Sequence, residues 1–310
     1  MRLFIQLVFV SLQHLNNKAM GDLESKPAPP SYSPPPTPPP PSPTFREPWR
    51  KISWSNKEED MKYVKNYQPG NPEVKHLRIM LYGPVGAGKS SFISSVNNII
   101  IDRQGFSTTD GDASFTTKYE THRIQKGGRG DFYPFVFNDI MGLEDNGGVT
   151  VEDIKLALQG HVRDGYTFNN RSALSDTDPG YNSSPSVDDR VHLLVCVYSA
   201  NTSEIKESVL QKMKEIREAA SDLGIPQVAI ITKVDEACEE TEKDLKNVYK
   251  SKYLKKKMTD FSSQLGIPLN CIFPVKNYSS EINIDDDVDS LILSALRRMI
   301  DFGDDFINKM

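Results

Sequence analysis

The stretch GPVGAGKS, residues 83–90, fits the pattern G-x4-G-K-[ST]. The apolar run LRIMLY precedes it at 77–82, and the stretch KSSFISSVNNII continues from it at 89–100. Glycines let a backbone turn wrap closely around an anion, and successive N–H groups at a helix N-terminus supply hydrogen-bond donors. The stretch therefore predicts a phosphate-binding loop between a strand and a helix.

Two side chains of this loop carry the chemistry. Lys89 is expected to reach the β and γ phosphates of a nucleoside triphosphate and is the first candidate catalytic residue. The hydroxyl of Ser90 is expected to coordinate Mg²⁺. The loop residues expected to bind the nucleotide are Gly83, Pro84, Val85, Gly86, Ala87, Gly88, Lys89, Ser90 and Ser91.

The chain around the loop alternates apolar runs of strand length with amphipathic helical stretches, which is typical of an α/β fold with a parallel sheet. We expect a P-loop NTPase fold (a G-domain) with a mostly parallel six-stranded sheet and helices on both faces. By resemblance to the GTPase class of this fold, the second strand is expected to run antiparallel at the edge. The expected strands are 77–82, 119–124, 132–138, 191–198, 227–232 and 271–275.

The sequence Asp139-Ile-Met-Gly142 follows the third expected strand and reads DxxG. Asp139 is expected to hold Mg²⁺, and the Gly142 N–H to meet the γ phosphate, so that loss of this phosphate would release the following loop. Thr116 and Thr117 are both candidates for a threonine that contacts Mg²⁺ and the γ phosphate, and Thr117 is carried forward as the metal ligand. The expected catalytic residues are Lys89, Thr117 and Gly142, and the expected metal ligands are Ser90, Thr117 and Asp139.

The choice between ATP and GTP depends on the motif TKVD at 232–235, at the carboxyl end of the fifth expected strand, where ligands bind in open parallel sheets. An Asp235 carboxylate there can accept hydrogen bonds from N1–H and N2–H2 of guanine, whereas adenine offers no matching pair of donors. The motif therefore favours guanine nucleotides, GTP and GDP.

Composition limits the alternatives. The chain has 310 residues and a formal net charge of −5, which argues against a DNA-binding protein with a basic surface. Three cysteines without metal-ligand spacing favour a reducing, cytoplasmic compartment. The apolar run at residues 3–10 is too short to span a membrane, so no transmembrane segment is expected there. Residues 1–20 allow two interpretations, a secretory signal or a leader ahead of a second start at Met20.

Twelve of the 21 prolines lie between positions 27 and 48. Proline lacks a backbone donor and has a restricted φ, so this tract predicts an extended polyproline II arm rather than a helix or strand. Its PxxP spacings would suit an SH3 or WW module. The expected organisation is a disordered N-terminal segment, 1–47, followed by one GTPase-like domain, 48–310.

The motifs GPVGAGKSSF, SFTTKYETHRI, DIMGLE, ITKVDE and FPVKNYSSE occur in this order. Together they resemble the interferon-induced protein 44 family of GTPase-like proteins, over roughly residues 48–310. The resemblance implies a cytoplasmic, interferon-inducible protein that binds GTP and takes part in antiviral defence. The nucleotide contacts that it implies outside the phosphate loop are Asp139, Gly142, Thr232, Lys233 and Asp235. On the far side of the base, Lys276 and Asn277 replace the usual segment that closes the guanine pocket.

Leu143 follows DxxG at the position where many fast GTPases have a glutamine that orients the attacking water. Slow hydrolysis is therefore expected.

The sequence leaves three hypotheses for the function. The first is a regulatory GTPase whose segments 116–117 and 142–148 order around GTP and expose a surface for a partner or a second copy. The second is a non-enzymatic adaptor that recruits partners through the proline-rich arm, and the third is an ATP-dependent kinase or transport ATPase.

Overall fold

A computed structural model describes residues 42–101, 116–127, 130–169, 171–281 and 283–310. The second start at Met20, the leader at 1–20 and nearly all of the proline-rich tract, with its PxxP spacings, lie outside these residues. Their expected disorder and their proposed SH3 or WW contacts remain predictions.

The chain forms one six-stranded sheet in the order β2-β3-β1-β4-β5-β6. β2 pairs antiparallel with β3 at the edge, and every other neighbouring pair is parallel. This confirms the expected fold class, with strand ends that differ from the expected ones by at most two residues. The strands are β1 Leu77–Tyr82, β2 Glu120–Gln125, β3 Phe132–Asp139, β4 Leu193–Ser199, β5 Gln227–Thr232 and β6 Ile272–Pro274.

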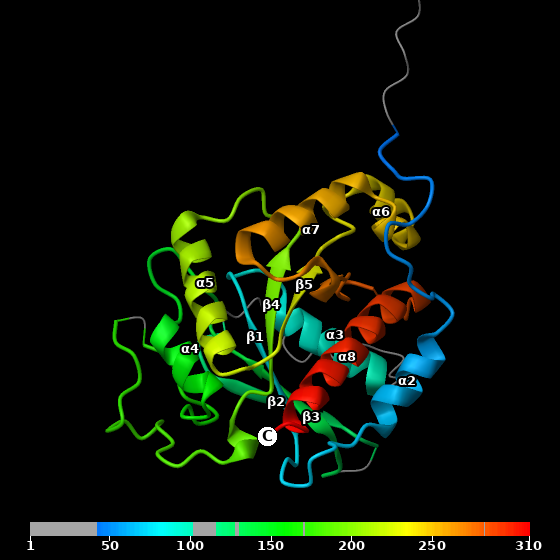
Figure 1. Cartoon of the computed structure of the whole chain (residues 1–310). Helices are drawn as coiled ribbons and strands as arrows, with labels where there is room; N and C mark the ends of the chain where they lie inside the picture. The colour runs from blue at the N-terminus through cyan, green and yellow to red at the C-terminus, as the bar shows by residue number, and fades with distance from the viewer. Residues whose placement is uncertain (1–41, 102–115, 128–129, 170, 282) are drawn as a thin grey trace, which may run out of the picture. The chain divides into compact units, whose positions relative to one another are not determined.

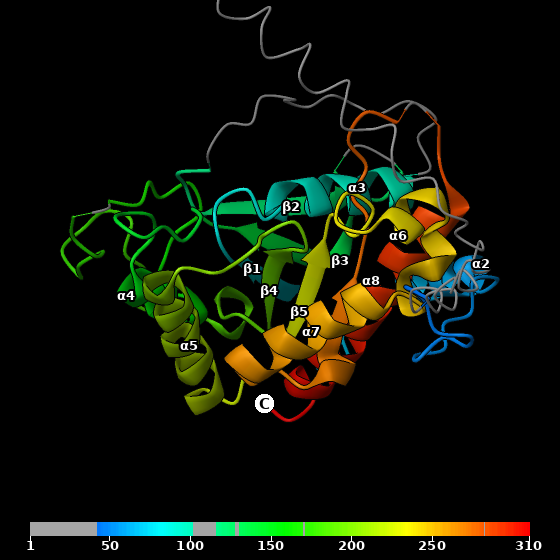
Figure 2. The ribbon, with the colours of Figure 1, turned by 90° about the horizontal axis from the view of Figure 1, so that it is seen from above.

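Helices cover both faces of the sheet. α2, α3 and α8 contribute to the core on one face, and α4, α5 and α7 to the core on the other (Figures 1 and 2). Within the described ranges, no helix combines the length and the apolar character needed to cross a membrane. The helices are α2 Lys57–Asn66, α3 Lys89–Ile101, α4 Val151–Leu158, α5 Glu207–Asp222, α6 Glu239–Lys243, α7 Lys252–Leu265 and α8 Asp286–Ile307.

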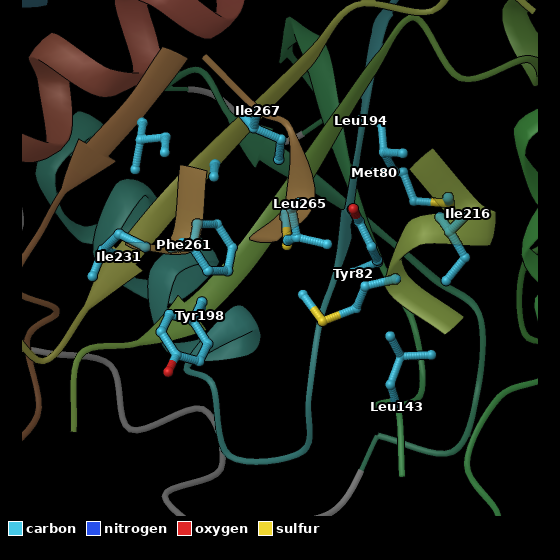
Figure 3. Packing of buried hydrophobic residues seen from close by; sticks show 14 of the residues in the cluster. Met80, Tyr82, Leu143, Leu194, Tyr198, Ile216, Ile231, Phe261, Leu265 and Ile267 are labelled. Carbon is cyan, nitrogen blue, oxygen red and sulfur yellow. The ribbon is translucent and has the colours of Figure 1, made fainter. Parts of the chain in front are cut away.

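The alternation of side chains along β1 shows how the two cores form. Ile79 and Leu81 enter the core beneath α3 and α8, whereas Met80 and Tyr82 enter the core beneath α5 and α7, because successive strand residues point to opposite faces. Figure 3 shows part of this second core, with Met80 and Tyr82 among the side chains from neighbouring strands and helices. A central strand that is buried on both faces leaves the binding chemistry to the ends of the strands.

Helix α8 follows from its sequence pattern. The Asp285 side chain accepts hydrogen bonds from the N–H groups of Asp287 and Val288 and so caps the first turn. An apolar stripe is buried along one face from Val288 to Met299, against β1 and β4. The helix thereby supports the strand that ends in the phosphate loop.

The N-terminal part of the described chain packs on α7 and on the residues before it. The N–H of Phe45 donates to the Lys250 carbonyl at 2.8 Å, and the Lys252 N–H donates to the Pro43 carbonyl at 3.1 Å. The Trp49 ring stands edge-on to Tyr249, with ring centroids 5.3 Å apart. These contacts begin at Ser42, ahead of the expected boundary at 48, because backbone hydrogen bonds and aromatic contacts hold residues that composition alone assigned to the arm.

Candidate functional site

The predicted site residues gather at one edge of the sheet. The phosphate loop follows β1, DxxG and TKVD overlap the ends of β3 and β5, and Lys276 and Asn277 follow β6. The four strands are parallel, so their carboxyl ends meet at the same edge. Topology therefore brings together segments that lie as far as about 190 residues apart in the chain.

Gly83 lets β1 turn into the loop beside β4. Its φ is 150°, and a Cβ at this position would lie 2.1 Å from the carbonyl oxygen of Val197. No other residue type fits such a close approach of two backbones. The turn leads the loop to the N-terminus of α3, where an anion is favoured.

Lys89 is the first residue of α3 and is only 7% exposed. Its Nζ donates to the carbonyl oxygens of Gly83 and Pro84, at 3.4 Å each. Burial lowers the pKa of Lys89, and the nearby Asp139 carboxylate opposes that shift. The ammonium thus lies within the loop with long hydrogen bonds to neutral carbonyls, so a phosphate there would be a much stronger partner.

Three oxygen-bearing side chains meet beside Lys89. Ser90 Oγ donates to Asp139 Oδ2, and Thr116 Oγ1 lies 3.3 Å from both Ser90 Oγ and Asp139 Oδ2. Asp139 is 1% exposed, and its Oδ1 has no hydrogen-bond partner among the described residues. Hydroxyl and carboxylate oxygens are ligands that Mg²⁺ prefers, and an unpartnered buried carboxylate oxygen is costly without a cation. These residues therefore fit a magnesium ion.

The structure places Thr116 in this cluster in place of the expected Thr117. Thr117 is exposed, and its carbonyl accepts a hydrogen bond from Phe168 N–H at 3.0 Å. The two threonines lead into a bridge between Lys118 and Thr167, and neighbouring residues of an extended segment point to opposite sides. Only one of the pair can face Ser90, and it is Thr116.

The DxxG segment lies directly on the phosphate loop. Leu143 N–H donates to the Gly83 carbonyl at 3.0 Å, and Val85 N–H donates to the Leu143 carbonyl at 3.3 Å. A Cβ on Gly142 would lie 2.4 Å from Val85 Cγ2, so glycine is required for this contact. Leu143 itself is 2% exposed and joins the core under α5 (Figure 3). Its side chain is therefore held away from the loop.

Two residues expected at the base instead brace the phosphate loop. Thr232 is fully buried, and its Oγ1 donates to the Ala87 carbonyl at 2.6 Å. Asn277 Nδ2 donates to the Gly88 carbonyl at 3.1 Å, while Asn277 Oδ1 is buried without a partner in the part of the chain that the structure describes. The ends of β5 and β6 thus support the loop from its outer side.

Asp235 remains accessible beside a lysine. Lys276 Nζ lies 3.5 Å from Asp235 Oδ2 and 3.0 Å from Glu281 Oε1, and all three side chains are partly exposed. Burial lowers the pKa of Lys276, but the two carboxylates outweigh this effect and leave its pKa raised. Lys233, with φ 56°, adopts the left-handed conformation, which is uncommon for a lysine and often found at functional sites.

One residue beside the site, Lys212, belongs to no recognisable sequence motif. Lys212 on α5 donates from its Nζ to the carbonyl oxygens of Glu144, at 2.7 Å, and Gly147, at 3.1 Å. A lysine on an amphipathic helix reads as a solvated residue in sequence, and the contact exists only because α5 packs beside the loop that follows β3.

No family model matches the chain. Interferon-induced protein 44 of Pan troglodytes and that of Homo sapiens are each 36% identical to it over 252 residues, which is 80% of this chain and 56% of either relative. The Mus musculus protein of the same name is 34% identical over 251 residues, covering 80% of this chain and 59% of the relative. The chain therefore spans somewhat more than half the length of these relatives.

Among solved structures, two of Toc33 from Arabidopsis thaliana are similar in outline. A dimerization-deficient mutant has a TM-score of 0.47 and 13% sequence identity, covering 80% of this chain and 92% of that one. The complex with GDP and Mg²⁺ has a TM-score of 0.46 and 14% identity, covering 81% and 91%. The family resemblance of the motifs is confirmed by the curated relatives: over the residues that it shares with them, the chain belongs to the interferon-induced protein 44 family.

Proposed function

We propose that the protein binds GTP and GDP together with Mg²⁺ at the carboxyl edge of the sheet. One observation carries this proposal: the buried Lys89 ammonium lies beside a cluster of Ser90, Thr116 and Asp139 in which Asp139 Oδ1 has no partner among the described residues. Lys89 would bind the β and γ phosphates, and the three oxygen-bearing side chains would hold the metal ion directly or through water. The bound Mg²⁺ would neutralise phosphate charge.

The guanine preference is proposed to come from Asp235. Its carboxylate is partly exposed beyond the end of β5 and can accept the two donors of a guanine edge, while Lys276 holds it in place. Lys233, Thr232 and Asn277 would support this side of the site, the last two through the phosphate loop. A charged hydrogen-bond partner of this kind contributes about 1.5 to 3 kcal/mol, which corresponds to a roughly 10- to 150-fold preference.

Hydrolysis is proposed to be slow, so that the bound nucleotide acts as a switch. The side chain after DxxG, Leu143, is buried in the core and cannot orient water. Since the relatives are named for their induction by interferon, we propose a role in the innate antiviral response and a cytoplasmic location. Nucleotide-dependent contact with a partner or with a second copy completes this proposal.

Competition between nucleotides tests the proposal. A fluorescent GTP analogue bound in the presence of Mg²⁺ should be displaced by GDP at concentrations at least 10-fold lower than by ATP. Asp235→Ala should remove this difference while binding persists, and Lys89→Ala should abolish binding of both. Equal displacement by ATP and GDP in the unmodified protein would contradict the guanine assignment, and failure of any nucleotide to bind would refute the function.

A further inference from the structure

The loop that begins at Gly142 of DxxG, residues 142–148, is held from two sides, and we call it the switch loop. On one side it pairs with the phosphate loop through the backbone of Leu143, as described above. It also folds on itself, since Leu143 bridges Gly148 and a Cβ on Gly148 would lie 2.5 Å from the Gly142 carbonyl oxygen. The loop therefore has little freedom to move without breaking contacts.

The other side of the switch loop is held by α5. Lys212 Nζ donates to the carbonyl oxygens of Glu144 and Gly147, and so closes the loop with one ammonium. The Asp145 carboxylate accepts hydrogen bonds from Ser208 Oγ and from Lys206 Nζ, the latter at 3.2 Å. Ser208 and Lys212 are four residues apart and therefore lie on the same face of α5.

Helix α5 is a rigid support for these contacts. Its apolar stripe, which adjoins the row of Ser208 and Lys212, buries Leu210, Met213 and Ile216 in the core, alongside Leu143 of the switch loop. Lys212 is the group that reaches two carbonyls of the loop at once, whereas Asp145 contacts the exposed start of the helix. Loss of the Lys212 ammonium would leave Glu144 and Gly147 carbonyls to water and would loosen the middle of the loop.

We propose that Lys212 is a positioning residue that holds the switch loop closed against the phosphate loop and thereby sets the preference for GTP over GDP. This inference rests on the proposed function. In the proposed complex only the γ phosphate would meet Gly142, so only GTP would gain from a loop that is ordered before the nucleotide arrives. A loop without Lys212 would lose conformational freedom on binding GTP but not on binding GDP.

The test compares Lys212→Met with Lys212→Arg and Lys214→Met in the full chain. Arginine can donate to two carbonyls and should retain most of the effect. Lys214 lies on the same helix, and its side chain has no hydrogen bond or ion pair within the described ranges, so it is the matched control. Affinities for GDP and for a non-hydrolysable GTP analogue are measured by titration with Mg²⁺. Amide hydrogen exchange of peptides covering residues 142–148 is measured without nucleotide.

Lys212→Met should lower the affinity ratio of the GTP analogue to GDP by about 5-fold or more and should accelerate exchange in the switch loop, while Lys214→Met changes neither. An equal loss for both nucleotides, an unchanged ratio or a raised ratio would overturn the inference. If the unmodified protein binds neither nucleotide, the proposed function fails together with the GTP preference. In that case faster exchange in Lys212→Met would still show that Lys212 orders the switch loop, and unchanged exchange would show that it does not.

Discussion

Leu143 shows how the burial of one side chain limits chemistry. Its backbone joins the phosphate loop, but its side chain enters the core under α5. This packing decides where the side chain points. Replacing Leu143 by a residue that can orient water is therefore not sufficient to raise the catalytic rate. A polar side chain placed here would be buried before it could meet a water molecule near the nucleotide.

Leu143→Gln should therefore destabilise the protein without accelerating GTP hydrolysis. Burying an amide in an apolar core costs about 1 to 3 kcal/mol, in addition to the lost apolar contacts. Chemical unfolding and single-turnover phosphate release measure the two effects. Glu144→Gln, one position along and partly exposed, is the control for a nearby change. A Leu143→Gln protein of unchanged stability that releases phosphate faster would show that this side chain reaches the nucleotide.

His192 gives the protein a dependence on acid. It is fully buried ahead of β4, where Nδ1 accepts the Arg78 N–H at 2.9 Å and Nε2 lies 2.9 Å from the Val187 carbonyl. Burial lowers the pKa of His192 to about 4, from 6.5. The unfolded chain therefore binds a proton between pH 6.5 and 4 while the folded protein does not, so stability falls as the pH drops through this window.

Through His192, the free energy of unfolding is expected to fall by about 3 kcal/mol between pH 6.5 and pH 4. Urea unfolding at several pH values measures it. His192→Gln, which keeps a donor and an acceptor, should show a shallower decline than the unmodified protein. Burial also lowers the pKa of His76, so the difference between the two proteins, rather than the total decline, reports on His192. Parallel curves for the two proteins would mean that His192 is accessible to protons when folded.

At the scale of elements, the described N-terminal segment packs against the start of β6 and the residues just before it. Arg50 Nη1 donates to the Ile272 carbonyl at 2.6 Å, and Nη2 donates to the Leu269 carbonyl. The guanidinium carbon also lies 4.9 Å from the centre of the Trp49 ring. Since β6 leads into Lys276 and Asn277, these contacts also support the segment proposed to lie near the base.

A chain that begins at Lys51 should melt below a chain that begins at Ser42. It loses the Trp49 contact with Tyr249 and the two hydrogen bonds of Arg50, which together contribute about 2 to 4 kcal/mol. For a domain of this size the difference in Tm should be about 5 to 10 °C, measured by calorimetry. Equal melting temperatures would show that the segment adds no stability. A start at Ser42 is also the cleaner truncation for testing partner recruitment by the proline-rich arm.

At the scale of the whole molecule, the site joins the ends of four strands, so a ligand there should stabilise the entire sheet. At about 100 times its Kd, a nucleotide adds about 2.7 kcal/mol to the free energy of unfolding. Melting with Mg²⁺ and GTP or GDP should therefore raise the Tm by about 5 to 10 °C. ATP at the same concentration should raise it less, and removal of Mg²⁺ with a chelator should reduce the gain from GTP. No shift with any nucleotide would contradict the proposed site.

Periodicity and motif spacing were sufficient to predict the sheet and the position of Lys89, Ser90 and Asp139, whereas the antiparallel edge was expected from the resemblance to GTPases. Local signals specify these features: strand residues alternate between two faces, and the glycine pattern is required wherever a backbone encloses phosphate. The carboxyl ends of parallel strands meet by topology, so the sequence alone assigns motifs on different strands to one edge.

The remaining features depend on which surfaces pack together. Whether Thr116 or Thr117 faces Ser90 depends on the register of an extended segment, and one residue of difference reverses its direction. The side chains of Thr232 and Asn277 donate hydrogen bonds to the phosphate loop because β5 and β6 end beside it. Lys212 reaches the loop at 142–148 only through the docking of α5. Such contacts join residues far apart in the chain, and no local pattern of amino acids records them.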